Sequence, residues 1–255
     1  MPEIVASRNR TLTDGRKKLV GYVLVGYPDC DSFFSVLDCC NRSSLDVLEL
    51  GFPSRNPYSD GEVIAKAHLS VDHEKACSLE YWKEVRSRTE KPIWLMAYRS
   101  DFIGSGVYRD FAASGVLDAV VIPDMTNEER MKLSEEMKPY GVDVVNFVNP
   151  GMSIGESDIV FSEGGLVYEQ LYVGQTGSSS QSDEYLKMLG ESLKYPGVTS
   201  FAGFGISTPE QVVSKYRNGF DGVIIGTAIL KHLNVSLESM NQYLGEIGRA
   251  KELWH

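Results

Sequence analysis

Two carboxylates, Glu49 and Asp60, carry the clearest chemical signal in the sequence. Glu49 lies near the end of a short apolar run at 47–50, and Asp60 precedes a glycine in the segment that follows. The run predicts a buried strand, on which successive side chains point to opposite faces. A carboxylate on a buried strand face is costly unless it is paired, neutralised or used. Burial also raises its pKa toward the range in which a carboxyl group transfers protons near neutrality.

A loop after this strand would return Asp60 to the same rim as Glu49. Two carboxylates in different environments can divide acid and base roles between them. A structural alternative fits the same residues, because Glu49 could pair with an internal Arg or Lys and Asp60 could be a turn residue before Gly61. The residues alone leave both interpretations open.

Two glycine-containing turns predict a phosphate site. Residues 203–207 read Gly-Phe-Gly-Ile-Ser before a predicted helix start at Thr208-Pro209, and Gly226-Thr227 opens a further helix. Backbone N–H groups at helix N-termini bind phosphate, and glycines allow close backbone approach and a positive φ. Ordinary turns between strands and helices use the same residue types, but the pair of turns together favours phosphate.

The segment 170–182 contains no charged residue and is mostly small and polar. Such a composition is flexible, and a long loop in a compact domain is usually functional. We therefore expect a lid over the site. A surface loop without a function is the alternative.

Short apolar runs alternate with helical patterns along the chain and must position these groups. The runs are mostly rich in β-branched residues, as buried parallel strands are; they lie at 19–25, 47–50, 93–96, 119–122, 142–148, 166–171, 199–202 and 222–225. The helical patterns lie at 32–40, 79–88, 127–138, 183–193 and 209–217, with a weaker one after Ile154.

Eight strands alternating with helices predict an α/β fold, a single (β/α)8 TIM barrel spanning 1–255. An open, doubly wound sheet is the competing fold. It is disfavoured because no GxGxxG follows the first strand and no change of composition marks a second half. In a barrel, the face shared by Val47 and Glu49 would point inward, with Glu49 at the C-terminal rim of the second strand and Asp60 in the loop after it, where active sites are built.

The amino-acid composition excludes several classes of binding partner. The formal net charge of −10 argues against nucleic acid or an anionic membrane. Four cysteines without CxxC or zinc spacing indicate reduced thiols and no metal site. The polar N-terminus lacks the apolar region of a signal peptide, and no apolar stretch approaches the roughly 20 residues of a membrane span. We expect a cytoplasmic protein.

Together these elements resemble the tryptophan synthase alpha subunit family over nearly the whole chain, from Leu19 to about His232. The strings that carry the resemblance include Leu-Glu-Leu-Gly-Phe-Pro and Gly-Phe-Gly-Ile-Ser-Thr-Pro-Glu; all of them lie at 48–53, 60–61, 95–98, 121–124, 176–177, 203–210 and 225–229. The order of Glu49, Asp60 and the glycine-rich string makes the match specific.

The resemblance implies a retro-aldol lyase that cleaves indole-3-glycerol phosphate to indole and glyceraldehyde 3-phosphate. It implies no cofactor in this chain, and a β subunit with pyridoxal phosphate that receives the indole in an α2β2 complex. Glu49 would shuttle protons, and Asp60 would accept the indole N–H. The remaining implied residues bind the substrate: Tyr22, Met96, Tyr98, Asp124, Phe147 and Tyr168 around the indole, Gly177, Gly205, Gly226 and Thr227 around the phosphate, and Thr176 in the lid.

The chain departs from the family pattern at the rim and in the lid. Asn56 replaces a usual acidic residue beside a new cation, Arg55, and Arg99 precedes Ser100 where the family usually has Asn. Tyr22 stands where Phe is common, and the lid reads Leu171-Tyr172 where Ser-Arg is usual. These departures concern partner contact and lid closure, so two alternatives stay open: a stand-alone lyase, and a subunit with little lyase activity that mainly activates its β subunit.

Overall fold

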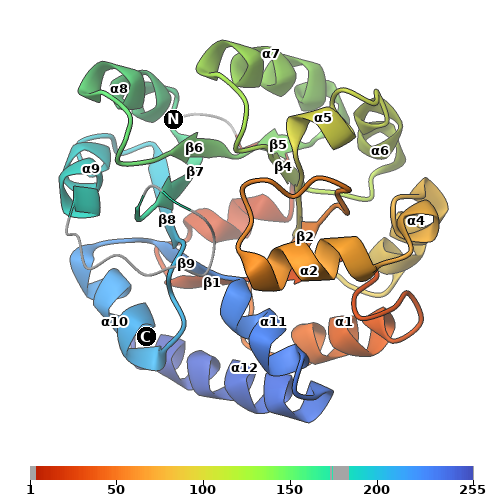
Figure 1. Ribbon diagram of the computed structural model, residues 1–255. Helices are drawn as coiled ribbons and strands as arrows, with labels where there is room; N and C mark the ends of the chain where they lie inside the picture. Colours follow the sequence, from red (N-terminus) through yellow and green to blue (C-terminus); the bar gives the residue numbers. More distant parts are fainter. Residues whose placement is uncertain (1–3, 173, 175–183, 255) are drawn as a thin grey trace.

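The computed structural model describes residues 4–172, 174 and 184–254, and its centre is a parallel β-sheet ringed by helices (Figure 1). The strands are β1 (Lys18–Leu24), β2 (Val47–Gly51), β3 (Ile93–Met96), β4 (Ala119–Val121), β5 (Asp143–Val144), β6 (Asn146–Val148), β7 (Gly165–Gln170), β8 (Val198–Gly203) and β9 (Gly222–Ile225). Their spatial order is β5-β4-β3-β2-β1-β9-β8-β7-β6.

The sheet closes into a barrel through Val145. Strand β5 pairs with β4 and strand β6 pairs with β7, and a single residue separates β5 from β6. The Val145 N–H donates to the Val120 carbonyl at 2.9 Å, so β4 holds this residue too. The predicted strand 142–148 is therefore one barrel position divided into two short strands, and the predicted (β/α)8 fold is confirmed.

The helices follow the strands along the chain and cover the outside of the barrel (Figure 1). They are η1 (Asn9–Thr13), α1 (Phe33–Arg42), α2 (Glu62–Ser70), α3 (His73–Ala76), α4 (Leu79–Ser87), α5 (Arg99–Phe102), α6 (Tyr108–Ser114), α7 (Asn127–Met137), η2 (Lys138–Tyr140), α8 (Ile154–Glu163), α9 (Glu184–Ser192), α10 (Pro209–Asn218), α11 (Thr227–Leu233) and α12 (Leu237–Glu252). The weak helical pattern after Ile154 is the well-capped α8, in which Ser153 and Glu156 form a capping box. Among the helices just named, none has the length and apolar character needed to cross a membrane.

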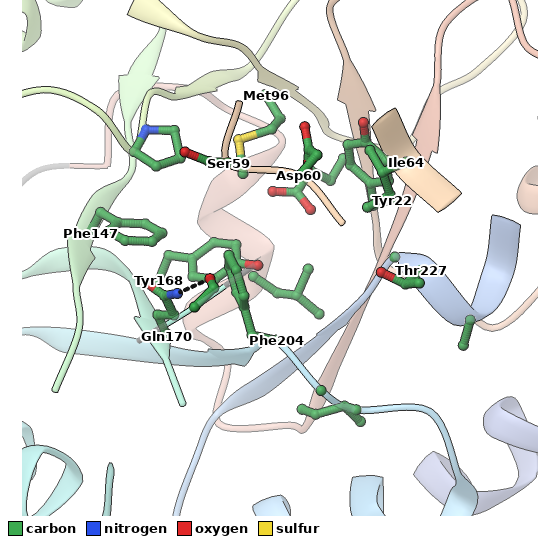
Figure 2. A pocket seen from close by; sticks show the side chains of 18 of the residues that line it. Tyr22, Ser59, Asp60, Ile64, Met96, Phe147, Tyr168, Gln170, Phe204 and Thr227 are labelled. Atoms are coloured by element: carbon green, nitrogen blue, oxygen red, sulfur yellow. Dashed lines mark hydrogen bonds between the residues drawn. The ribbon is translucent and has the colours of Figure 1, made fainter. Parts of the chain in front are cut away.

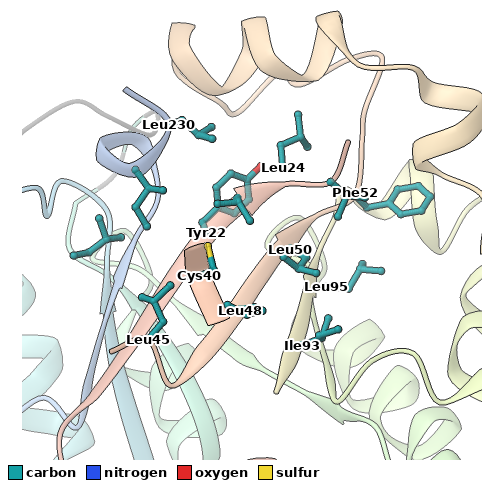
Figure 3. Packing of buried hydrophobic residues seen from close by; sticks show 14 of the residues in the cluster. Tyr22, Leu24, Cys40, Leu45, Leu48, Leu50, Phe52, Ile93, Leu95 and Leu230 are labelled. Atoms are coloured by element: carbon teal, nitrogen blue, oxygen red, sulfur yellow. The ribbon is translucent and has the colours of Figure 1, made fainter. Parts of the chain in front are cut away.

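Alternation along the strands separates an inner core from an outer one. Large side chains such as Trp94, Tyr168 and Phe201 fill the barrel interior. Their neighbours along the strands point outward and pack under the helices, and Figure 3 shows Leu48, Leu50 and Phe52 doing so from β2 and the loop that follows it. Val47 belongs to the inner core and Leu48 to the outer one. The predicted inward direction of the Val47–Glu49 face is therefore confirmed.

The N-terminal end of the barrel is closed by polar contacts beneath this inner core. The Trp94 indole N–H donates to Asn9 Oδ1 at 3.0 Å, and Asn9 Nδ2 donates to Asp143 Oδ2 at 2.8 Å. Leu12 of η1 joins the inner cluster. With this end filled, the carboxyl ends of the strands remain as the face on which a cavity forms.

Candidate active site

Glu49 lies on the inner face of β2, between Tyr22 of β1 and Trp94 of β3 in the strand register. Glu49 is only 1% exposed, and no described residue hydrogen-bonds to its Oε1. Burial, with a contribution from the negative charge of Asp60, raises the pKa of Glu49 to about 8. Glu49 is therefore mostly a neutral acid at neutral pH, and it has a proton to give.

Asp60 ends the loop between β2 and α2 and faces the same cavity. The Tyr98 hydroxyl donates to Asp60 Oδ2 at 2.8 Å, and the Ser59 backbone N–H donates to the Tyr98 oxygen at 3.1 Å. Asp60 Oδ2 also lies 3.5 Å from Nε2 of His68. The second carboxylate is thus held by side chains from the loop after β3 and from α2.

The rim above these groups is tied together by Asp124, which follows β4. The Tyr58 hydroxyl donates to Asp124 Oδ2 at 2.7 Å, and the Arg99 backbone N–H donates to Oδ1 at 2.9 Å. The rings of Tyr58 and Tyr98 lie 4.7 Å apart. The loops after β2, β3 and β4 therefore form one connected wall.

A cavity of about 700 Å³ opens at this end of the barrel. Figure 2 shows Phe147 and Tyr168 on one side of it, with Tyr22 and Thr227 on the other. The cavity is lined by every predicted site residue that the structure describes: Tyr22, Glu49, Asp60, Met96, Tyr98, Asp124, Phe147, Tyr168, Gly205, Gly226 and Thr227. Such a volume suits a small organic ligand.

The two predicted phosphate turns differ in how their helices begin. Helix α10 is capped from within, because Gln211 Oε1 accepts the backbone N–H groups of Ser207 and Thr208 at 2.8 and 3.1 Å. Helix α11 has Gly226 as its N-cap and no side-chain capping bond. Gly226, Thr227 and Ala228 at this helix start line the cavity, so the second turn is the better anion site.

The predicted role of the glycines is only partly right. Gly205 has φ of 74°, as expected for a turn that only glycine adopts easily. Gly226 has φ of −125°, so a left-handed backbone is not its reason. At Gly203 an added Cβ would lie 2.2 Å from the Tyr168 ring, so this glycine makes room for an aromatic side chain of the cavity.

Thr176, Gly177 and most of the predicted lid at 170–182 lie outside the described residues. The described part shows what replaces the usual Ser-Arg pair. Leu171 and Tyr172 are both buried, and the Tyr172 ring lies 6.0 Å from that of Phe204. The entrance to this loop is therefore anchored by aromatic packing.

Several cavity residues were missed by the sequence analysis, including His68, Phe204 and Lys231. His68 carried a usable signal, because Ile64 and His68 share one face of α2 and Asp60 precedes Ile64 by the same four-residue spacing. Lys231 similarly follows Thr227 by four residues in α11. Phe204 has φ of 75°, which is rare for a non-glycine residue and could not be read from its type.

Known proteins resemble this chain along its whole barrel. The model of a family described as "Tryptophan synthase alpha chain" matches residues 9–252. The tryptophan synthase alpha chain of Caldicellulosiruptor bescii is 30% identical over 246 residues, which cover 94% of this chain and 95% of the relative. That of Prochlorococcus marinus is 32% identical over 237 residues, which cover 90% and 86%.

Among solved structures, a chain of Mycobacterium tuberculosis tryptophan synthase superposes with a TM-score of 0.84. It is 21% identical, and the match covers 96% of this chain and 98% of that chain, so the likeness shows the barrel fold. The family model and the curated relatives add the sequence evidence, and the closed barrel with Glu49 and Asp60 in its cavity agrees with both. The chain belongs to the tryptophan synthase alpha chain family, the carbon–carbon lyases that release indole from indole-3-glycerol phosphate.

Proposed function

We propose that Glu49 and Asp60 carry out the lyase reaction of this family in the cavity described above. The bond between indole C3 and the glycerol phosphate side chain breaks only if C3 gains a proton and the C3′ hydroxyl loses one. The observation that carries the proposal is the neutral, buried Glu49 carboxyl, whose Oε1 has no hydrogen-bonding partner among the described residues. Glu49 donates the proton to C3 and then, as the carboxylate, takes the hydroxyl proton.

Asp60 stabilises the positive charge that protonation places on the indole ring. As a carboxylate it accepts the indole N–H, and the charge of that hydrogen bond grows as the ring is protonated. The Tyr98 hydroxyl, 2.8 Å from Asp60 Oδ2, supports this orientation. Asp60 and Glu49 thereby divide the work as a charged stabiliser and a neutral acid.

The indole ring fits the apolar half of the cavity. Phe147 and Tyr168 stand with ring centroids 5.1 Å apart on one side, and Met96 lies across from them (Figure 2). Tyr22 and Tyr98 add to the aromatic lining, and Asp124 holds the rim through Tyr58 and Arg99. An aromatic slot that ends in two carboxyl groups suits a flat ring with one N–H.

The phosphate fits the opposite end, at Gly226 and Thr227. The start of α11 offers N–H groups without a side-chain cap, and Lys231 brings a positive charge to the same end. Gly205 contributes close backbone approach, and Thr176 and Gly177 of the lid would complete this end. Thr227→Asp should abolish binding of glycerol phosphate in isothermal titration, whereas the isosteric, uncharged Thr227→Asn should retain it.

We further propose that the chain acts in the cytoplasm as a single domain, 1–255, paired with a β subunit in an α2β2 complex. The alpha family pairs with a β subunit in tryptophan synthase, and pyridoxal phosphate would belong to that subunit alone. The exposed residues Arg55, Asn56 and Arg99 would lie at the contact. Arg99 is already paired with Glu129 at 2.7 Å, so Arg55 and Asn56 are the better determinants of partner choice.

The test is release of indole from indole-3-glycerol phosphate, measured with and without a β subunit. We expect release by the chain alone and faster release in the complex. A chain that releases no indole in either setting, yet stimulates its β subunit, would be an activating subunit and would overturn the proposal. Release that a β subunit leaves unchanged would identify a stand-alone lyase and remove the partner from the proposal.

A further inference from the structure

A buried histidine stands beside Asp60 and takes no part in the mechanism above. His68 lies in the last turn of α2 and is 3% exposed. Four-residue spacing from Asp60 through Ile64 brings its ring back over the loop at 52–61 that carries Asp60. The side chain therefore faces both the beginning and the end of that loop.

The hydrogen bond of one ring nitrogen fixes the proton on the other. The Ser54 backbone N–H donates to His68 Nδ1 at 3.0 Å, so Nδ1 is an acceptor. Burial, with the nearby His73 adding to it, lowers the pKa of His68 to about 4, and the ring is neutral at neutral pH. A neutral imidazole has one N–H, and here that N–H is on Nε2.

The Nε2–H points at two oxygens of the cavity wall. Asp60 Oδ2 lies 3.5 Å from Nε2, and the Tyr22 hydroxyl lies 3.4 Å from it. The carboxylate is the stronger acceptor because it is charged. Both distances are long for hydrogen bonds, and catalytic hydrogen bonds commonly tighten only when substrate is bound.

Tyr22 also contributes to the surroundings of the His68 ring, and Gly51 leaves room for it. The hydroxyl that distinguishes Tyr22 from a phenylalanine is the atom that faces His68. It fits because Gly51 has no side chain, and a Cβ there would lie 2.4 Å from the Tyr22 oxygen. The wall behind Asp60 is thus built for a polar contact.

We propose that His68 is a positioning residue, which orients the Asp60 carboxylate through Nε2–H while Nδ1 fastens the start of the same loop at Ser54. The inference rests on the proposed role of Asp60 in binding the indole N–H. A displacement of about 1 Å at a reacting group can cost about a hundredfold in rate. A fixed loop therefore matters, and His68 acts on the reaction through Asp60.

Two near-isosteric variants separate the functions of the two nitrogens. His68→Gln places an N–H near the position of Nε2 in the parent. His68→Asn places an acceptor near the position of Nδ1 and no donor near Asp60. We expect kcat to fall about 10- to 100-fold in His68→Asn and His68→Leu, and to be rescued to within about tenfold of the parent in His68→Gln. KM should change little in all three. An Asn variant as fast as the parent, or faster than the Gln variant, would overturn the proposal.

A spectroscopic measurement decides the matter without turnover. In ¹⁵N spectra at neutral pH we expect His68 as the Nε2–H tautomer, with an Nε2 resonance that moves in Asp60→Asn and stays in place in the surface control Asp110→Asn. An Nδ1–H tautomer, or a resonance insensitive to Asp60, would refute the positioning role. Failure of the parent to release indole would instead count against the proposed function, and the spectra would still report on His68.

Discussion

Glu49 and Glu169 are two buried glutamates that face opposite sides of the barrel wall. Glu49 points inward from β2, and Glu169 points outward from β7, on the face of Val167, which packs under α8 and α9. Burial raises the pKa of each to about 8. Their electrostatics are alike, but only Glu49 lines the 700 Å³ cavity.

The comparison shows that a raised pKa does not by itself make a catalytic acid. Glu169 is 0% exposed and does not line the cavity, so its proton has no route to a ligand there. Glu49 is equally desolvated, but it lines the cavity together with Asp60. A desolvated carboxyl group acts as a catalytic acid when a ligand can reach it and a second charged group lies in the same site.

The largest expected effect follows removal of the Glu49 proton. Glu49→Gln keeps the shape of the side chain and should lower kcat for indole release by about 10²–10⁴-fold, the range of general acid–base catalysis. The matched variant Glu169→Gln should keep kcat within about twofold of the parent, because that side chain touches no ligand. Steady-state assays of both variants test the comparison directly. Comparable losses in the two variants would break it.

Asp60→Asn should lower kcat by about 10²–10³-fold, because an amide cannot stabilise the positive charge that develops on the indole ring. It should also lower the pKa of Glu49, since the charge of Asp60 is the second cause that raises it. The pKa of Glu169 should not change. Titration of both carboxyls by ¹³C NMR in the parent and the variant should show a changed pKa for Glu49 alone. Equal changes in the two pKa values would contradict the charge of Asp60 as a cause of the raised pKa of Glu49.

Turnover should fall as the pH rises through about 8, where Glu49 loses its proton. The sign follows from the role, since only the protonated carboxyl donates to C3, and each pH unit above the pKa should cost about tenfold. A profile of kcat against pH from 6 to 10 measures this fall. The control variant Glu169→Gln should show the same fall above about pH 8. A flat profile to pH 10 would remove Glu49 as the acid.

The smallest effect on turnover, with a visible one on stability, is expected for Glu169→Gln. The folded pKa of about 8 lies above the unfolded value, so the parent should lose about 1.4 kcal/mol of unfolding free energy per pH unit between about pH 4.5 and 8 through this group. The glutamine variant lacks this loss, and its advantage over the parent should grow through that window. Urea unfolding at pH 5 and pH 8 measures it. If the unfolding free energies of the parent and the variant change equally between these two pH values, Glu169 is not neutral in the folded protein.

Much of this comparison was predictable from residue order. The 47–50 run gave Glu49 an inward direction because side chains alternate along a strand, and the strand count gave the closed barrel that places Asp60 on the same rim. Glu169 was read only as part of an apolar run at 166–171. Its burial depends on α8 and α9 packing over the sheet, and a single strand pattern does not contain that contact.

The sequence by itself determined the barrel, the inward carboxylate and the glycine-rich turns, because periodicity and backbone freedom are local properties. The capping box of Thr208 and Gln211 at the start of α10 is likewise a local pattern, whereas only the tertiary structure decided that the start of α11, which no side chain caps, lines the cavity. It also decided the partners of Asp60, because Tyr98 and His68 come from separate elements that closure brings together. Distances between elements are set by packing, which no local pattern records.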